Sequence, residues 1–320
     1  INRSAADTLS LQVNSTSALN GTINTGARVS GTVGQLYTGV ATLDGNTVLT
    51  TTNDDIRFAN KVESDSSDRN LTLTTGTQNV LFVNTVGADA DKEVGAIVIT
   101  GGMIASNTIE AASLSVSLTS SISADVTTTG AAGQVYSGIA TNGAGNARTL
   151  TATNGDVNFV TGYRGNSQIL NIVGALDLDT GNITGITTMD VTTTSNIASN
   201  ITSTGVQAYD GAVTLTGAST MTTTDGNVTF GSTIVSDSSD RALTVVTDDS
   251  NDVVQFANTV GAGADSELGA IAITGILDAN NTIEAASLTV SGASTLGGNV
   301  STTGGVGQVF SQWAKGIGCK

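Results

Sequence analysis

The feature that most constrains this chain is a long segment that occurs twice. The sequence SDSSDR at 64–69 returns at 236–241, and NTIEAASL at 107–114 returns at 281–288. The second copy follows the first by 172 residues at one motif and by 174 at the other, so the copies differ by a short insertion. In a chain of short runs rich in Thr and Val, duplication on this scale indicates a stacked repeat architecture.

Composition favours an ordered all-β fold. The chain has 39 Gly, no Pro and no His, and 38% of its residues are hydrophobic. Val, Ile, Leu and Thr alternate along the chain instead of being segregated, a pattern that disordered chains lack. Pro removes a ladder donor and is tolerated only at sheet edges and bulges, so its absence is typical of a backbone that is almost entirely paired.

Short β-branched runs bounded by Gly, Asn or Asp predict many strands and no helix. Examples are 48–52, 71–75, 96–100 and 114–118. In a parallel solenoid each rung pairs with the rungs above and below it, ~4.8 Å away, and stacks its Val, Ile and Leu inside. We therefore expect a parallel β-solenoid built from duplicated repeats.

A Gln followed two positions later by an aromatic residue marks the repeats. The four pairs are Gln35 with Tyr37, Gln134 with Tyr136, Gln207 with Tyr209, and Gln308 with Phe310. Period-2 alternation puts both residues of a pair on the same side of a strand. They are either an inward aromatic with a Gln that satisfies a turn, or an exposed platform for a ligand. We favour the first, because periodic aromatic residues usually fill gaps in a core.

These motifs divide the chain into five segments. They are an N-terminal cap or docking segment at 1–29, a first solenoid repeat at 30–129, a shorter repeat at 130–202, a second full repeat at 203–312 and a C-terminal docking segment at 313–320.

The repeat pattern is clearest in TGVQAYDGAVTL at 204–215, followed by TTTDGNVTF at 222–230. Together with the SDSxxRxLTV run, it resembles the β-strand repeats of giant bacterial surface proteins, the filamentous-haemagglutinin and autotransporter-type adhesins. The resemblance covers residues 30–312 and implies a right-handed parallel β-helix that is exported to the cell surface or beyond. This chain departs from that pattern in its length and in the final SQWAKGIGCK at 311–320, which replaces a further rung.

Charge excludes two classes of partner. The net charge of −16 argues against nucleic-acid binding and against docking on anionic lipid. No apolar run approaches the ~20 residues of a membrane helix, so we expect no membrane insertion. A single Cys excludes an intrachain disulfide framework.

Catalysis has little support in the sequence. Without His there is no Ser-His-Asp triad, Cys-His pair or His-metal site. The acidic clusters are duplicated along with the repeats, which argues against one evolved active site. We predict that the chain is not an enzyme; a polysaccharide-cleaving β-helix that uses clustered carboxylates stays an alternative.

Calcium and ice are two further candidate ligands. No cofactor is predicted, and calcium is the one metal that the abundant oxygen ligands would suit, although no EF-hand loop or nonapeptide motif occurs. Its weak candidate ligands are Asp89, Asp91, Glu93, Asp265 and Glu267. An ice-binding solenoid is a further alternative, but Thr falls in irregular clusters such as 127–129 and 192–194, and no Thr-x-Thr repeats at one fixed rung length.

The C-terminal segment is unlike the rest of the chain. It holds the single Trp, Trp313, the single thiol, Cys319, and a small basic end made by Lys315 and Lys320. It is either a tail or cap, or a docking element that covers the terminal rung of the next subunit, with 1–24 as the complementary end.

The sequence therefore predicts a non-enzymatic, extracellular, structural or adhesive β-solenoid. Its expected partners are copies of itself, assembled head to tail into a surface fibre, and then glycans or extracellular matrix. The first alternative is a monomeric passenger or stalk segment of a larger bacterial adhesin.

Overall fold

The computed structural model describes residues 10–26, 33–143, 145–247, 251–263, 265–312 and 314–315. These residues form β-strands and no helix, and every strand pair is parallel. The predicted all-β class and parallel β-solenoid are confirmed. The described residues contain no helix of the length and hydropathy that a membrane crossing needs.

The chain divides into two compact units, Ile1–Thr161 and Gly162–Lys320. The strands of unit 1 are β1 (Leu11–Val13), β2 (Ser17–Thr25), β3 (Gln35–Tyr37), β4 (Ala41–Thr51), β5 (Ile56–Phe58), β6 (Val62–Ser64), β7 (Leu71–Phe82), β8 (Val94–Ala105), β9 (Ile109–Val116), β10 (Ser120–Ile122), β11 (Val126–Thr128), β12 (Gln134–Tyr136), β13 (Ala140–Asn142) and β14 (Arg148–Phe159).

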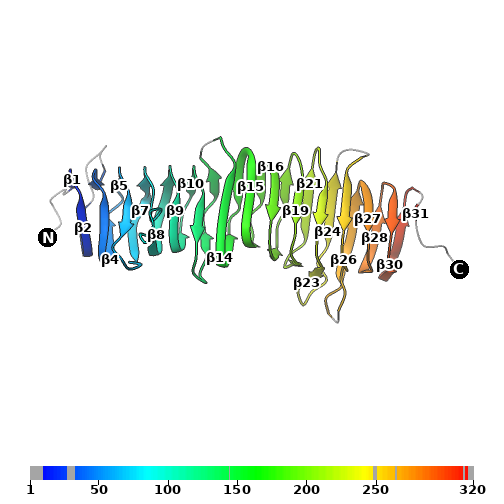
Figure 1. Cartoon of the computed structure of the whole chain (residues 1–320). Coiled ribbons are helices and arrows are strands. Elements are labelled where there is room, and N and C mark those ends of the chain that lie inside the picture. Colours follow the sequence, from blue (N-terminus) through cyan, green and yellow to red (C-terminus); the bar gives the residue numbers. More distant parts are fainter. Residues whose placement is uncertain are drawn as a thin grey trace. The chain divides into compact units, whose positions relative to one another are not determined.

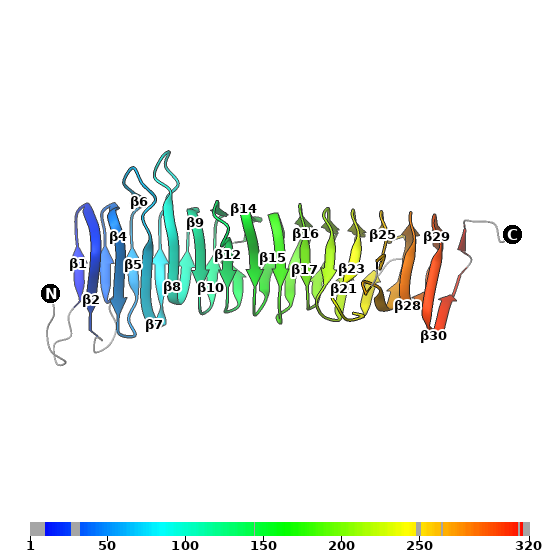
Figure 2. The same cartoon turned by 90° about the horizontal axis from the view of Figure 1, so that it is seen from below.

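The strands of unit 2 are β15 (Tyr163–Leu178), β16 (Ile183–Val191), β17 (Ser195–Ile197), β18 (Ile201–Ser203), β19 (Gln207–Tyr209), β20 (Val213–Leu215), β21 (Ser219–Thr223), β22 (Val228–Phe230), β23 (Ile234–Ser236), β24 (Leu243–Thr247), β25 (Val253–Phe256), β26 (Leu268–Thr274), β27 (Ile276–Ala279), β28 (Ile283–Val290), β29 (Ser294–Leu296), β30 (Val300–Phe310) and β31 (Ala314–Lys315). Figures 1 and 2 show the strands of each unit stacked as successive coils.

Each coil of unit 1 contributes to three parallel ladders, which we call the A, B and C walls. The A wall contains β1, β3, β5, the ends of β7 and β8, β10 and β13. The B wall contains the starts of β2 and β4, β6, the bridge residue Val86, the start of β9, β11 and the start of β14. The C wall contains the ends of β2 and β4, the starts of β7 and β8, the end of β9, β12 and the end of β14.

Unit 2 has the same three walls, named by their equivalence to those of unit 1. The A wall contains the middle of β15, the end of β16, β19, β22, β25, β27, β29 and β31. The B wall contains the end of β15, β17, β20, β23, Val260 and the starts of β28 and β30. The C wall contains the start of β16, β18, β21, β24, β26 and the ends of β28 and β30.

The duplicated sequence produces the same inward column in both units. On the A wall of unit 1, successive coils stack Tyr37, Phe58, Phe82, Ala105 and Ile122. On the A wall of unit 2 they stack Tyr209, Phe230, Phe256, Ala279 and Leu296. Equivalent sequence positions therefore occupy equivalent places in the fold, aromatic on aromatic and aliphatic on aliphatic.

Alternation along each strand builds the core. A buried and a partly exposed residue alternate through most strands, for example over β4 and β24. Fully burying an aliphatic or aromatic side chain of this size contributes about 1.5–3 kcal/mol. The core holds nearly all of the aromatic side chains, and each inner coil packs against the coils on both of its sides.

One glycine at a corner is required in both copies. Gly87 and Gly261 have φ angles of 67° and 71°. A Cβ at either position would overlap a backbone carbonyl oxygen of the next coil, that of Glu110 or Glu284. Only glycine fits both the left-handed conformation and the close approach.

Candidate functional site

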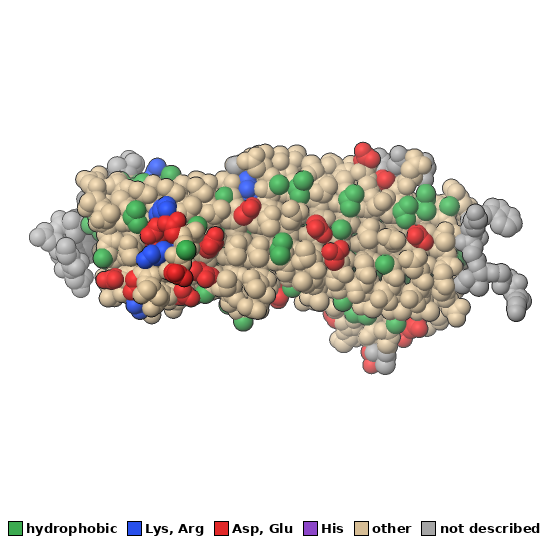
Figure 3. Space-filling view, viewed as in Figure 1, with side chains coloured by type: hydrophobic (Ala, Val, Ile, Leu, Met, Phe, Trp, Pro, Cys, Tyr) green, Lys and Arg blue, Asp and Glu red, His purple; other side chains and the backbone are tan. Residues whose placement is uncertain are grey.

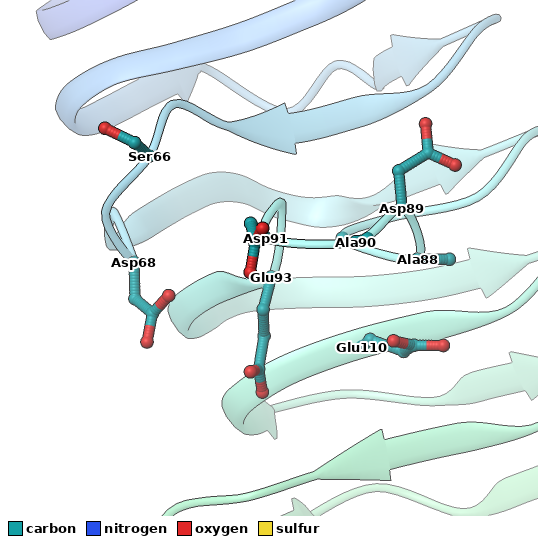
Figure 4. A pocket seen from close by; sticks show the side chains of 9 residues that line it. Ser66, Asp68, Ala88, Asp89, Ala90, Asp91, Glu93 and Glu110 are labelled. Atoms are coloured by element: carbon teal, nitrogen blue, oxygen red, sulfur yellow. The ribbon is translucent and has the colours of Figure 1, made fainter.

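Charged side chains gather on one part of the surface of unit 1, as Figure 3 shows. The loops that follow β6 and precede β8, together with the start of β9, form a pocket of about 380 Å³ in unit 1. Its lining residues are Ser66, Asp68, Gly87, Ala88, Asp89, Ala90, Asp91, Glu93 and Glu110. Figure 4 shows the Asp89 carboxylate pointing away from those of Asp68 and Glu93, so the carboxylates do not converge on one point.

Two of the pocket's carboxylates are already bound by the protein. Lys61 Nζ donates to Asp89 Oδ2 at 2.6 Å and lies 3.9 Å from Glu63 Oε1. The hydrogen bond from Lys61 lowers the pKa of Asp89 and raises that of Lys61, while burial and a hydrogen bond with Asp89 raise the pKa of Glu63. Thr129 Oγ1 donates to Glu93 Oε1 at 2.8 Å. The pocket is thus formed by surface loops in which Asp89 and Glu93 are bonded to other side chains of the protein. It is not an open anionic site.

The structure gives the calcium candidates no ligand set. Asp89, Asp91 and Glu93 all line the pocket. Yet among the described residues no group of three or more Asp, Glu, His or Cys side chains is arranged to hold a metal ion. The unit 2 candidates, Asp265 and Glu267, are the counterparts of Asp91 and Glu93.

The second copy lacks the charged side chains of this network. The unit 2 equivalents of Lys61, Glu63, Asp89 and Lys92 are the uncharged Thr233, Val235, Gly263 and Ser266. The paired charges have therefore changed together, as expected for groups that stabilise one another. The network belongs to unit 1 alone and is not a site repeated with the fold.

The SDSSDR motif forms the same ion pair in each unit. Arg69 donates to both carboxylate oxygens of Asp65, at 2.9 and 2.7 Å, and Arg241 donates to those of Asp237 at 2.9 and 2.8 Å. These bonds are the main cause that lowers the pKa of each aspartate. Because Asp237 also accepts from the backbone N–H of Ser239, the motif fixes the shape of the loop. Sequence reasoning found the motif but not this role.

We expect Asp237→Asn to loosen this loop without unfolding unit 2. The pair is half-buried and screened by solvent, so its loss should change the global stability only slightly. Since the folded pKa of Asp237 is lowered, the ion pair is complete above the ordinary pKa of aspartate and is lost as the pH falls through the lowered value. Hydrogen exchange at the Ser239 and Arg241 amides should accelerate in the variant and, for the intact chain, at acid pH. Asp240→Asn is the matched control, and equal exchange in both variants would contradict the assignment.

The Gln and Tyr pairs lie inside the solenoid and link neighbouring coils. Tyr37, Tyr136 and Tyr209 are fully buried, and each hydroxyl donates to its own Gln, at 3.0, 2.9 and 3.1 Å. The Gln134 side-chain amide donates to the carbonyl oxygens of Val126 and Thr151, at 3.1 and 2.9 Å. These geometries match the core interpretation and leave no exposed platform at the three tyrosines.

The four pairs of Gln and aromatic residues differ from one another in two respects. Tyr37 and Tyr209 lie on the A wall, but Tyr136 lies on the C wall, where β12 pairs with β9 and β14. The fourth pair is not enclosed: Gln308 is exposed and Phe310 is half-buried. The reason is that β30, among the described residues, pairs with β28 alone and is covered by a coil on one side only.

Two of the exposed hydrophobic side chains lie close together in the sequence of β30. Val306 and Val309 are 68% and 43% exposed, the highest values among the large hydrophobic side chains that the structure describes. Both lie in β30. Among the described residues, the strand thus combines an edge without a pairing strand and exposed apolar side chains.

Most of the predicted C-terminal docking residues lie outside the part of the chain that the structure describes. Trp313, Cys319 and Lys320 lie outside the described residues, as does the side chain of Lys315. The backbone of Lys315 is in β31 and pairs with Thr295 of β29. At the other end, residues 1–9 and 27–29 of the predicted docking segment also lie outside the described residues.

Comparisons of the chain with protein families, with curated proteins and with solved structures found no match. The β-solenoid implied by the resemblance to bacterial surface repeats is present in the structure, and the adhesin type stays a proposal.

Proposed function

We propose that this chain is a non-enzymatic, extracellular β-solenoid with a structural or adhesive role, which assembles head to tail into a fibre. The observation that carries the proposal is the edge of β30. An unpaired parallel strand with exposed Val306 and Val309 is a template for further pairing.

The first coil of unit 1 supplies a complementary edge. Among the described residues, β1 pairs with β3 alone and β2 with β4 alone. Pairing of β30 in one copy with β1 and β2 of another would join two different surfaces. Such a contact does not close on itself, so it produces a filament.

A structural role also agrees with the interior and with the pocket. The buried aromatic and aliphatic columns fill the coils, and the polar pocket of unit 1 has its Asp89 and Glu93 engaged by Lys61 and Thr129. The chain contains no His for acid–base or nucleophilic catalysis. Glycans or matrix remain the adhesive partners that we propose for such a fibre.

The second candidate is a stalk segment of a larger adhesin. In that case the edge of β30 would be covered by a further coil of a longer chain and not by a second copy. Sedimentation velocity over a wide concentration range separates the two. Assembly predicts a mass distribution that grows with concentration, whereas a single monomeric species at every concentration would overturn assembly and favour the stalk.

Salt should strengthen this assembly. Copies of a chain with a net charge of −16 repel one another. Raising the ionic strength from 0.01 to 0.15 M shortens the screening length from about 30 to about 8 Å. We therefore expect a larger sedimenting fraction at the higher salt concentration. A decrease with salt would mean that attraction between opposite charges, and not the apolar edge, drives the contact.

A further inference from the structure

On the C wall, three successive coils of each unit present two outward positions, where most strands of the other walls present one. In β7, Leu71 and Leu73 point inward and are buried, while Thr72 and Thr74 point outward. Thr72 pairs with Val98 and Thr74 with Thr100 in the next coil. Side chains on this wall therefore form two parallel rows.

The rows consist of Thr and other small residues in both units. In unit 1 the outward positions of three successive coils are Val48, Thr50, Thr72, Thr74, Val98 and Thr100. In unit 2 the equivalent positions are Thr220, Thr222, Thr244, Val246, Ala272 and Thr274. We call these two sets the threonine face of each unit.

The threonine face carries no charge on a strongly acidic chain. None of its positions is Asp, Glu, Lys or Arg, although the net charge is −16. Outward positions on the other walls do carry charges, for example Arg57 and Asp278 on the A walls and Glu63 and Glu284 on the B walls. An ion or a charged polymer would find no counter-charge on this face.

The face is also regular. Strand neighbours lie ~4.8 Å apart and outward positions on one strand about 6.6 Å apart, which gives a rectangular grid of methyl and hydroxyl groups. The backbone ladders fix the grid, and β-branched side chains have few rotamers to lose on binding. Among the described residues, the Thr72, Thr74 and Thr244 hydroxyls form no hydrogen bond with the protein.

Several partners fit this surface poorly. Sugar rings are commonly held by stacking on aromatic side chains, but nine of the chain's eleven aromatic residues are buried in the core. A second copy of an acidic chain would bring its −16 charge close along the whole contact. The partner that remains is uncharged, flat and periodic, with donors and acceptors at a spacing near that of the strands.

We propose that the threonine face binds the surface of ice crystals. The methyl groups would hold the adjoining water in an ordered layer, and the hydroxyls would link that layer to the protein. The lattice spacings of ice are close to those of the grid, so the contact repeats from coil to coil. This activity goes beyond the assembly proposed above and does not depend on it.

The experiment measures how much protein enters ice grown slowly from a solution of the full chain. The test variant combines Thr72→Lys with Thr244→Lys, one central position of each face. The matched control combines Thr42→Lys on a B wall with Thr229→Lys on an A wall, which are also outward and partly exposed. Circular dichroism and sedimentation establish that both variants keep the fold and the assembly of the intact chain.

We expect the intact chain and the control to be enriched in the ice and the test variant to be excluded from it. Exclusion of the intact chain, or equal enrichment of the test variant, would overturn the proposal. A test variant that loses assembly instead would show that the face is a contact between copies, which also overturns it. Failure of ice binding with normal sedimentation leaves the head-to-tail proposal standing, so the two are judged separately.

Discussion

Replacing Tyr136 with Ala is expected to lower the free energy of unfolding by about 3–5 kcal/mol. The ring is fully buried and stacks on Phe159 of the next coil, with 5.5 Å between the ring centroids. Its hydroxyl donates to Gln134, which in turn bonds to backbone carbonyls of two coils. The substitution therefore leaves a cavity and also an unpaired buried oxygen. Denaturant unfolding of the full chain measures the effect.

Two controls separate these contributions. Tyr136→Phe keeps the ring but leaves Gln134 Oε1 without its donor, which should cost about 1–3 kcal/mol. Val135→Ala changes the outward neighbour on the same strand and should stay within about 0.5 kcal/mol of the intact chain. If Tyr136→Ala cost less than about 1 kcal/mol, the buried placement would be wrong and a ligand-binding role would return.

The second large effect concerns the edge of β30. Val306→Lys combined with Val309→Lys should abolish assembly, because it puts two cations at the apolar contact and deters pairing along the strand. The fold should be unaffected, since both side chains are exposed. Sedimentation velocity is expected to show monomer at concentrations where the intact chain assembles.

A matched control tests whether any exposed Val would give the same result. Val173 in β15 is 41% exposed, close to the 43% of Val309, and lies away from the end coils in sequence. Val173→Lys should assemble as the intact chain does. Assembly of the double variant would contradict the proposed interface, and loss of assembly in Val173→Lys would make the effect one of charge alone.

The fold was predictable because its signals are local. Alternation in runs such as 71–75 identifies strands with an inward face, and the duplicated motifs require a structure that repeats. The pairing of Gln134 with Tyr136 follows from period-2 alternation, and the preference of aromatic residues for gaps in a core indicated where they would lie.

The register between coils was not predictable, and it hid the threonine face. Thr72 pairs with Val48, 24 residues earlier, and with Val98, 26 residues later, while Val98 pairs with Ser115 after only 17. Coils of such unequal length scatter the Thr residues in sequence. The absence of a Thr-x-Thr at one fixed rung length therefore holds in the fold as well, where the corners absorb the difference in length and the rows mix Thr with Val and Ala.

The contacts of the acidic pocket also could not be predicted from the sequence. Asp89, Asp91 and Glu93 read as one cluster of ligands in the sequence. In the fold, Lys61 from the preceding coil binds Asp89, a contact across 28 residues that no local pattern indicates. The bond between Asp65 and Arg69 has a local signal, a carboxylate and a guanidinium four positions apart within a turn.

Electron microscopy of the negatively stained, purified chain tests the central claim most directly, namely that the stack of coils continues from one copy to the next. We predict unbranched fibres of uniform width that lengthen with protein concentration, and shorter fibres with a folded body when residues 313–320 are removed. Separate particles at every concentration would contradict the claim.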